Sequence, residues 1–165
     1  MSEESDRGRT QGECLLDVSK NSPFVEAVGS IDRFQASLGL AKVKMTNTDE
    51  KKRFSQMEKD LYEIMGSLYM GQSWANGDKK IEQIDKEIES TKKRISNLEG
   101  FLIPGENEIE ARINLCRTDC REAERRLVSL KIDREEKENL KFDLNVLKYF
   151  NRLSSLLNLM WRSKF

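Results

Sequence analysis

Arg117, Arg121 and Glu124 are spaced four and three residues apart, which places their side chains on one face of a helix. Each arginine directly follows a member of an apolar run with the same period, typical of a buried helix face: Ile109, Ile113, Cys116, Cys120, Ala123, Leu127 and Leu130. Guanidinium groups at the rim of a core can bind polyphosphate oxygens bidentately. The stripe predicts a phosphate pocket; the alternative is an Arg–Asp/Glu network that fixes the register between helices.

Other polar residues extend this candidate pocket. Asp32 lies beside the apolar seam of an earlier helix, and Asn151, with Arg152 and Ser154, lies at the seam of the last one. The segment 5–10, SDRGRT, has the small and cationic residues of a phosphate-binding loop, and Gly8 would let backbone N–H groups approach an anion. A segment of this composition is also typical of a disordered arm, so both interpretations stay open.

Composition excludes several kinds of function. The chain has 165 residues with 29 Lys and Arg against 29 Asp and Glu, a neutral total that argues against a nucleic-acid-binding protein. It contains no His, which excludes Ser-His-Asp, Cys-His and His-zinc chemistry. Cys14, Cys116 and Cys120 are expected to be unreactive core thiols, and no metal site is predicted. With neither a membrane-spanning run nor a signal peptide, we expect a cytoplasmic protein.

The positioning elements are expected to be helices. Ser22-Pro23 predicts a helix start, so residues 1–23 are interpreted as a loop or flexible arm and residues 24–165 as a single helical-bundle domain. Residues 131–141 are expected to be a loop or a frayed helical extension, and the charge runs 51–53 and 134–137 to be solvated. No strand is predicted. Five apolar seams predict an all-α, up-and-down bundle of about five helices, at 27–41, 54–68, 81–98, 109–130 and 144–160.

Several segments resemble one family. The segment 117–125, RTDCREAER, is similar to the Arg-Thr-x-Cys-Arg-Arg-Ala-Glu-Arg pattern of PduO-type ATP:cob(I)alamin adenosyltransferases. FLIPG at 101–105 and NRLS at 151–154 resemble that family's Phe-x-Leu-Pro-Gly-Gly and Asn-Arg-Leu-Ser-Asp. VSKNSPFVEAVGSID at 18–32 resembles its Val-Ser-Lys segment, and 5–10 falls on its ATP loop. The resemblance covers almost the whole chain.

The resemblance implies a five-helix bundle that forms a homotrimer with active sites between subunits. Such a protein transfers the 5′-deoxyadenosyl group of ATP, which binds with Mg2+, to the cobalt of cob(I)alamin and releases triphosphate. The implied catalytic residues are Arg117, Arg121 and Asp32, with Asp32 pairing with an arginine across the interface. The implied cofactor-binding residues are Asp6, Arg7, Gly8, Thr10, Lys20, Phe101, Arg121, Glu124 and Asn151, with Phe101 facing the corrin. Because cobalt(I) is itself the nucleophile, the absence of His does not conflict with this chemistry.

The chain departs from the family's pattern at residues of the expected site. The departures are Glu3, Ser5, Arg7, Glu106, Glu122 and Ser155, of which Glu122 replaces an arginine and Glu3 a lysine. A carboxylate at such a position repels phosphate. The sequence therefore leaves two alternatives to an active transferase: a weak or inactive paralogue that binds a nucleotide or corrinoid, and a structural helical oligomer.

Overall fold

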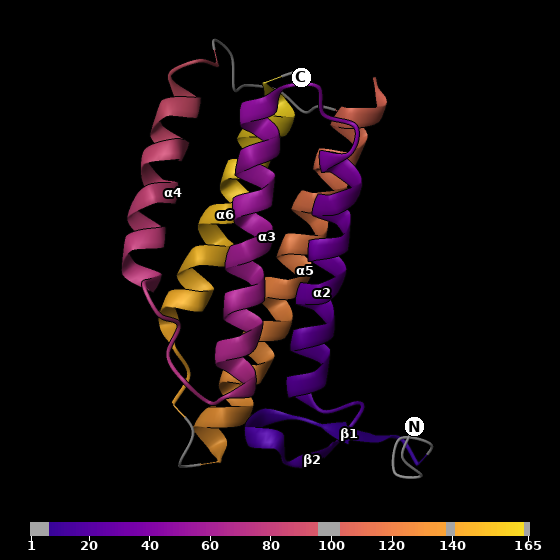
Figure 1. Cartoon of the computed structure of the whole chain (residues 1–165), viewed down its shortest axis with the longest axis vertical. Coiled ribbons are helices and arrows are strands. Elements are labelled where there is room, and N and C mark those ends of the chain that lie inside the picture. The colour runs from indigo at the N-terminus through magenta and orange to yellow at the C-terminus, as the bar shows by residue number, and fades with distance from the viewer. Residues whose placement is uncertain (1–6, 96–102, 138–140, 164–165) are drawn as a thin grey trace.

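The structure, a computed structural model, describes residues 7–95, 103–137 and 141–163, except for the side chain of residue 15. The described residues form five long helices that run up and down along one axis (Figure 1), which confirms the predicted all-α bundle. These are α2 (Pro23–Lys42), α3 (Thr48–Tyr69), α4 (Gly77–Lys92), α5 (Glu108–Glu136) and α6 (Leu144–Arg162).

Side-chain caps fix the helix starts. Ser22 precedes Pro23 and its hydroxyl accepts a hydrogen bond from the Val25 amide, so α2 begins where the sequence predicts. The Asn107 side chain accepts from the Glu110 amide at 2.9 Å at the start of α5. Each cap satisfies an amide that has no partner inside its helix.

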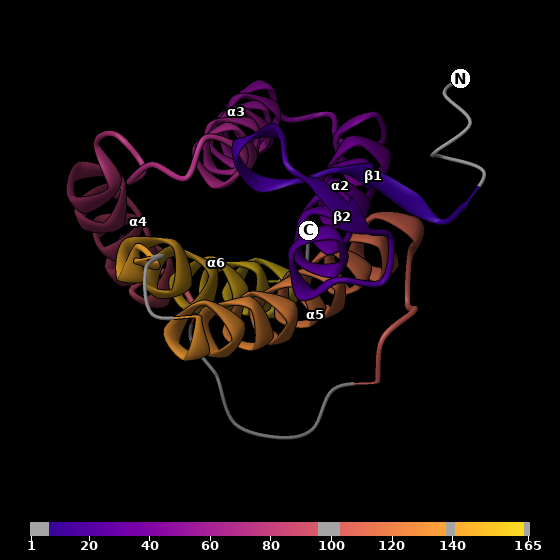
Figure 2. The ribbon, with the colours of Figure 1, turned by 90° about the horizontal axis from the view of Figure 1, so that it is seen from below.

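The helices enclose one apolar core. Seen from below, α5 and α6 form one side of the bundle and α3 lies on the other, with α2 packed against both α3 and α5 (Figure 2). The predicted seam of α5 is buried from Ile113 to Leu130, and Ile109 is partly buried. Because α5 packs against α2 and α6 along its length, its polar stripe is held beside a rigid core.

We expected a loop or flexible arm at residues 1–23, but the described part of this segment contains two short strands. It forms an antiparallel ribbon of β1 (Arg9–Gln11) and β2 (Asp17–Ser19), joined by the short 3-10 helix η1 (Glu13–Leu15), at one end of the bundle (Figure 1). An Arg9–Asp17 ion pair crosses the ribbon. Strands of three residues are too short to show a clear alternation in the sequence, so pattern reading missed them.

The ends of two helices differ from the expected bounds. We expected 131–141 to be a loop or a frayed helical extension. The helix α5 does extend to Glu136, but its end is not frayed at Arg134, which is buried beside Glu13. The run 134–137 is therefore not wholly solvated, because Arg134 has a partner on the ribbon. Helix α4 ends at Lys92, before the end of its apolar seam, while residues 96–102 lie outside the described residues.

Two of the three cysteines are core thiols, as predicted. Cys116 and Cys120 are fully buried on α5. Cys14 is exposed on η1, so the prediction of a core thiol was wrong for Cys14. Burial raises the pKa of the Cys116 thiol to about 12, and it also raises the pKa of Cys120. Among the described residues no helix combines the length and the apolar character required to cross a bilayer.

Candidate functional site

The candidate site is built on the antiparallel pair of α5 and α6. On α5, Arg121 Nη1 lies 3.9 Å from Glu124 Oε2. On α6, the side-chain amide of Asn151 donates a hydrogen bond to Glu124 Oε1 at 3.3 Å. The structure thus brings together three residues that the sequence predicted, and Glu124 joins the two helices. Its carboxylate can hold the arginine in place, while Arg121 itself stays 53% exposed.

Arg117 lies one helical turn before Arg121 and is held by aromatic and amide groups. Its guanidinium lies over the Trp161 ring, 5.5 Å from the centroid, and its Nε donates to Asn114 Oδ1 at 2.9 Å. The Trp161 indole donates in turn to Glu110 Oε1 at 3.0 Å, which fixes the ring. Burial, together with repulsion from Arg121, lowers the pKa of Arg117.

The two guanidiniums keep most of their charge available for a ligand. Within the described residues Arg117 makes no ion pair, and Arg121 has only its long contact with Glu124. Two neighbouring cations that repel each other favour a bound polyanion, because an anion relieves the repulsion. This arrangement fits a phosphate site better than a register-fixing network, in which carboxylates would neutralise both arginines.

Asp32 does not contact either arginine within this chain. It is exposed on α2 and makes no ion pair with the described residues. Its neighbour Arg33 instead lies 3.2 Å from the buried carboxylate of Asp119 on α5. This α2–α5 link was missed in the sequence, because nothing in the spacing of two residues so far apart indicates a pair.

The residues expected in the nucleotide loop lie on the ribbon. Gly8 has a left-handed backbone with φ of +75°, and its carbonyl accepts a hydrogen bond from the Lys20 amide at 2.8 Å. Thr10 pairs with Val18 across the ribbon, and Arg7 is exposed. The structure therefore brings Gly8, Thr10 and Lys20 together. Two predicted residues, Asp6 and Phe101, lie outside the described residues.

The contact between the N-terminal segment and α5 lies well along the helix from the arginines. The ribbon contacts the end of α5 at Arg134, and Arg121 lies about 20 Å back along that helix. Along α5, the point where Glu13 contacts this chain is therefore separated from the arginines by several helical turns. The residues predicted for the nucleotide site thus lie on different elements: the arginines on α5, and Gly8, Thr10 and Lys20 on or beside the ribbon.

Two departures from the family pattern have partners within the chain. Glu122 accepts from Arg125 and from Arg126, and these hydrogen bonds lower the pKa of its carboxyl group. Ser155 donates to the Asn151 carbonyl at 3.1 Å on α6. The carboxylate of Glu122 is therefore compensated locally and does not cancel the charge of Arg121.

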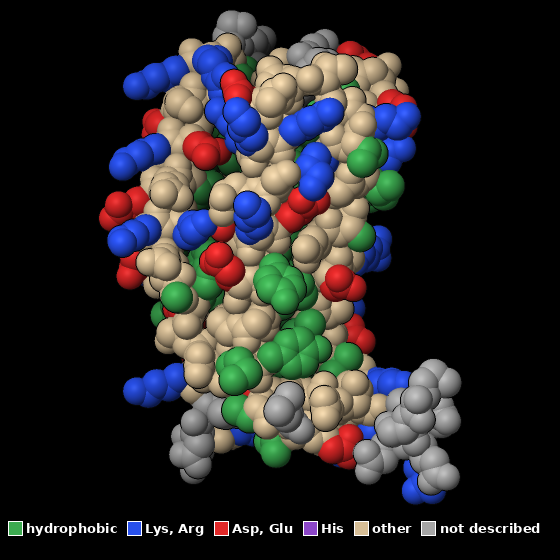
Figure 3. Space-filling view, viewed as in Figure 1, with side chains coloured by type: hydrophobic (Ala, Val, Ile, Leu, Met, Phe, Trp, Pro, Cys, Tyr) green, Lys and Arg blue, Asp and Glu red, His purple; other side chains and the backbone are tan. Residues whose placement is uncertain are grey.

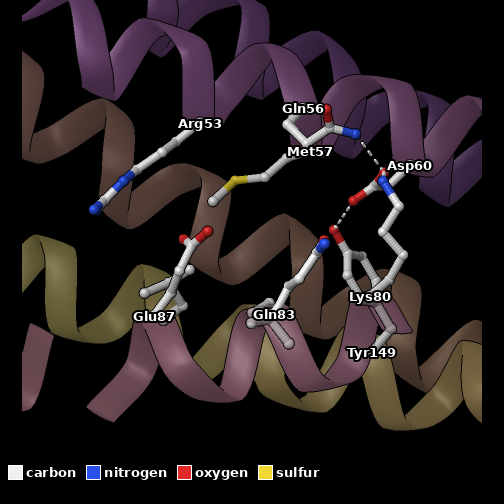
Figure 4. Close-up of a pocket in the computed structure, with 10 residues that line it drawn as sticks. Arg53, Gln56, Met57, Asp60, Lys80, Gln83, Glu87 and Tyr149 are labelled. Atoms are coloured by element: carbon white, nitrogen blue, oxygen red, sulfur yellow. Dashed lines mark hydrogen bonds and ion pairs between the residues drawn. The ribbon is translucent and has the colours of Figure 1, made fainter. Parts of the chain in front are cut away.

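A second polar cluster lies between α3, α4 and α6 (Figure 4). Asp60 is buried, and its carboxylate accepts from the Lys80 ammonium at 2.5 Å and from the Tyr149 hydroxyl at 2.8 Å. Arg53, expected to be solvated, lines the same cavity of about 50 Å3 with Glu87. The cavity holds little more than a water or two. Its central carboxylate already has charged and polar partners, so we interpret it as a structural network.

The face formed by α3 and α4 carries charges of both signs and some exposed hydrophobic residues. Figure 3 shows Lys and Arg side chains mixed with acidic ones over α4 and the upper part of α3, and hydrophobic side chains over the lower part of α3. Tyr62 and Met70 are the exposed hydrophobic residues on and just after α3. In the described part of the chain, no three His, Cys, Asp or Glu side chains are grouped to hold a metal ion.

Proteins similar to this chain in sequence include corrinoid and cobalamin adenosyltransferases. The chain is 28% identical over 153 residues to the corrinoid adenosyltransferase PduO of Citrobacter freundii, which covers 89% of this chain and 44% of the relative. It is 28% identical to the cobalamin adenosyltransferase of Cupriavidus metallidurans, covering 88% of this chain and 76% of that protein. The chain therefore spans less than half the length of its PduO relatives.

Solved structures share the fold. A variant PduO-type ATP:corrinoid adenosyltransferase from Lactobacillus reuteri, complexed with cobalamin and ATP, superposes with a TM-score of 0.85 at 19% identity, over 99% of this chain and 91% of that one. At this identity the likeness establishes the bundle architecture. The sequence profile of the cobalamin adenosyltransferase family matches residues 1–164. The chain therefore belongs to the cobalamin adenosyltransferase family.

Proposed function

We propose that this protein is an ATP:corrinoid adenosyltransferase, which transfers the 5′-deoxyadenosyl group of ATP to the cobalt of cob(I)alamin and releases triphosphate. The observation that carries the proposal is the neighbouring guanidiniums of Arg117, which has no ion pair with the described residues, and Arg121, which has only a 3.9 Å contact with Glu124, beside the Glu124–Asn151 hydrogen bond. These residues lie in the two segments that resemble the family's motifs, and the named relatives are adenosyltransferases.

The chemistry requires little from the protein beyond positioning and charge. The cobalt(I) of the substrate attacks C5′ of ATP, the C5′–O bond breaks, and its electron pair leaves with the triphosphate. Arg117 and Arg121 would bind the triphosphate oxygens and stabilise the charge that develops there. Glu124 and Asn151 would hold the nucleotide in line for attack. Mg2+ is expected to arrive with the nucleotide phosphates.

The site is proposed to be completed in a homotrimer. The separation of about 20 Å along α5 between the ribbon's contact and Arg121 supports this, because a neighbouring chain could bring its own ribbon to the arginines. Asp32, exposed and without an ion pair in its own chain, would pair with Arg117 of that neighbour. Phe101 is proposed to face the corrin. If Asp32 pairs with Arg117 of a neighbouring chain, Arg117→Ala should weaken the trimer and lower the mass of the assembly measured by light scattering. An unchanged mass would contradict the pairing.

Turnover is tested with the purified protein, ATP, Mg2+ and chemically reduced cob(I)alamin under anaerobic conditions. The corrin spectrum should convert to that of the adenosylated product faster than without protein. The matched control is the Arg117→Ala, Arg121→Ala double variant, which should fall to the background rate. A wild-type rate equal to the background would refute the transferase.

A second candidate, a paralogue that binds ATP without turnover, is favoured by one observation: Glu122 stands where the family pattern has arginine. Titration calorimetry separates it from the transferase, because this candidate predicts saturable ATP binding together with an unchanged corrin spectrum. The cytoplasmic location stays a prediction, to be tested by cell fractionation.

A further inference from the structure

A buried ion pair joins the N-terminal ribbon to the far end of α5. Arg134 is only 4% exposed, and its Nη2 lies 2.9 Å from Oε1 of Glu13, whose side chain is 12% exposed. The guanidinium also lies over the Phe142 ring, 5.6 Å from its centroid. Neither Nε nor Nη2 of Arg134 makes a hydrogen bond with the described residues, so the charge contact with Glu13 compensates this buried cation.

The turn that carries Glu13 also fits closely against the end of α3. Gly71 follows α3 with φ of +61°, and a Cβ placed there would lie 3.1 Å from Cys14 Sγ and 3.2 Å from Glu13 Oε1. A side chain at this position would push the turn away from α3. The turn is thus seated between the ends of α3 and α5, and both the left-handed backbone of Gly71 and these close contacts favour glycine there.

The position of the turn determines the position of the predicted phosphate loop, because the two strands of the ribbon connect them. Gly12 must lack a side chain, because a Cβ there would lie 2.5 Å from Val18. Thr10 pairs with Val18, and the Gly8 carbonyl accepts from the Lys20 amide, so both strands move together. Because Glu13 is only three residues from Thr10, a shift of the turn displaces the loop that contains Gly8.

We propose that Arg134 and Glu13 form a latch that positions the N-terminal ribbon for nucleotide binding. The proposal rests on the adenosyltransferase function proposed above. Arg134 touches no substrate: it is a positioning residue, which acts through Glu13 on Gly8 and Thr10. The latch affects the affinity for ATP and leaves the affinity for the corrinoid unchanged. Sequence patterns could not reveal it, since Arg134 looks like part of a charged run.

Steady-state kinetics on three variants test the latch: Glu13→Gln, Arg134→Met and the double variant. We expect KM for ATP to rise about tenfold to a hundredfold, while KM for cob(I)alamin changes by less than about twofold. The double variant should be no worse than the poorer single variant, because both remove the same pair. The matched control is Arg112→Met, which removes another arginine–glutamate pair from α5 and should leave both KM values unchanged.

Hydrogen exchange gives a readout that does not need activity. In the Glu13→Gln protein, amides of residues 9–19 should lose protection while those of α2, α5 and α6 keep it. An unchanged KM for ATP in an active Glu13→Gln protein, or equal rises of both KM values, would overturn the latch. Should Arg134→Met not fold, Glu13→Gln decides alone, since it keeps the shape of the side chain. If the wild type shows no turnover, the proposed function fails, and the latch is then judged by exchange: unchanged ribbon protection refutes it.

Discussion

Replacing Arg121 by Ala separates ligand binding from folding. The guanidinium is 53% exposed, and its ion pair with Glu124 spans 3.9 Å, so its loss should change the free energy of unfolding by less than about 0.5 kcal/mol. A charge-assisted contact to phosphate is worth about 1.5–3 kcal/mol. Since about 1.4 kcal/mol corresponds to a factor of ten, ATP should bind roughly tenfold to 150-fold more weakly.

The assay is calorimetric titration with ATP and Mg2+, together with urea unfolding of the same sample. Arg126→Ala is the matched control: this arginine lies on the same helix, its side chain is 46% exposed, and it pairs with Glu26 and Glu122 instead of facing Arg117. Arg126→Ala should bind ATP like the wild type. Equal affinities for all three proteins, or an unfolded Arg121→Ala variant, would refute the assignment of Arg121 to the phosphate site.

Three further outcomes are expected. Burial raises the pKa of Glu87 above its ordinary 4.5, so the cost of burying its charge is absent at low pH and complete above the raised pKa. Glu87→Gln should therefore raise the melting temperature at pH 7, with a gain that shrinks as the pH falls through the raised pKa and disappears below 4.5; an equal gain at pH 7 and below 4.5 would contradict this. A thiol reagent should modify Cys14 alone in the native protein, and Cys116 and Cys120 only after unfolding in guanidinium; rapid labelling of all three would show that the seam is open. Asp60→Ala leaves the partly buried Lys80 ammonium and the buried Tyr149 phenol without their acceptor, so the free energy of unfolding in urea should fall by about 3–5 kcal/mol; a fall under about 1 kcal/mol would show that the cluster is not structural.

The sequence predicts the helices well, because the buried face of each bundle helix requires apolar residues at helical spacing. The seam from Ile113 to Leu130 is buried as expected, and Ser22-Pro23 marks the start of α2. The ends were less predictable. Arg134 belongs to α5, but its burial depends on Glu13, which comes from a distant part of the chain. Local periodicity contains no information about such a partner.

The grouping of the candidate site was predictable where its residues share one helix. Arg117, Arg121 and Glu124 lie close together because a helix repeats every 3.6 residues, and the polar position of Asn151 on the last helix pointed to the same pocket. The Trp161 ring under Arg117 was not predictable: it comes from the end of another helix, and its position follows from the antiparallel packing of α5 and α6.

The contact between the first turn of the chain and the last turn of α5 has a consequence for biosynthesis. Its partners are about 120 residues apart, and closing such a loop costs roughly 4 kcal/mol of chain entropy, so it should form late in folding. On the ribosome, the N-terminal ribbon emerges first but cannot dock until α5 has been translated. A nascent chain would therefore carry the ribbon undocked until most of the bundle exists.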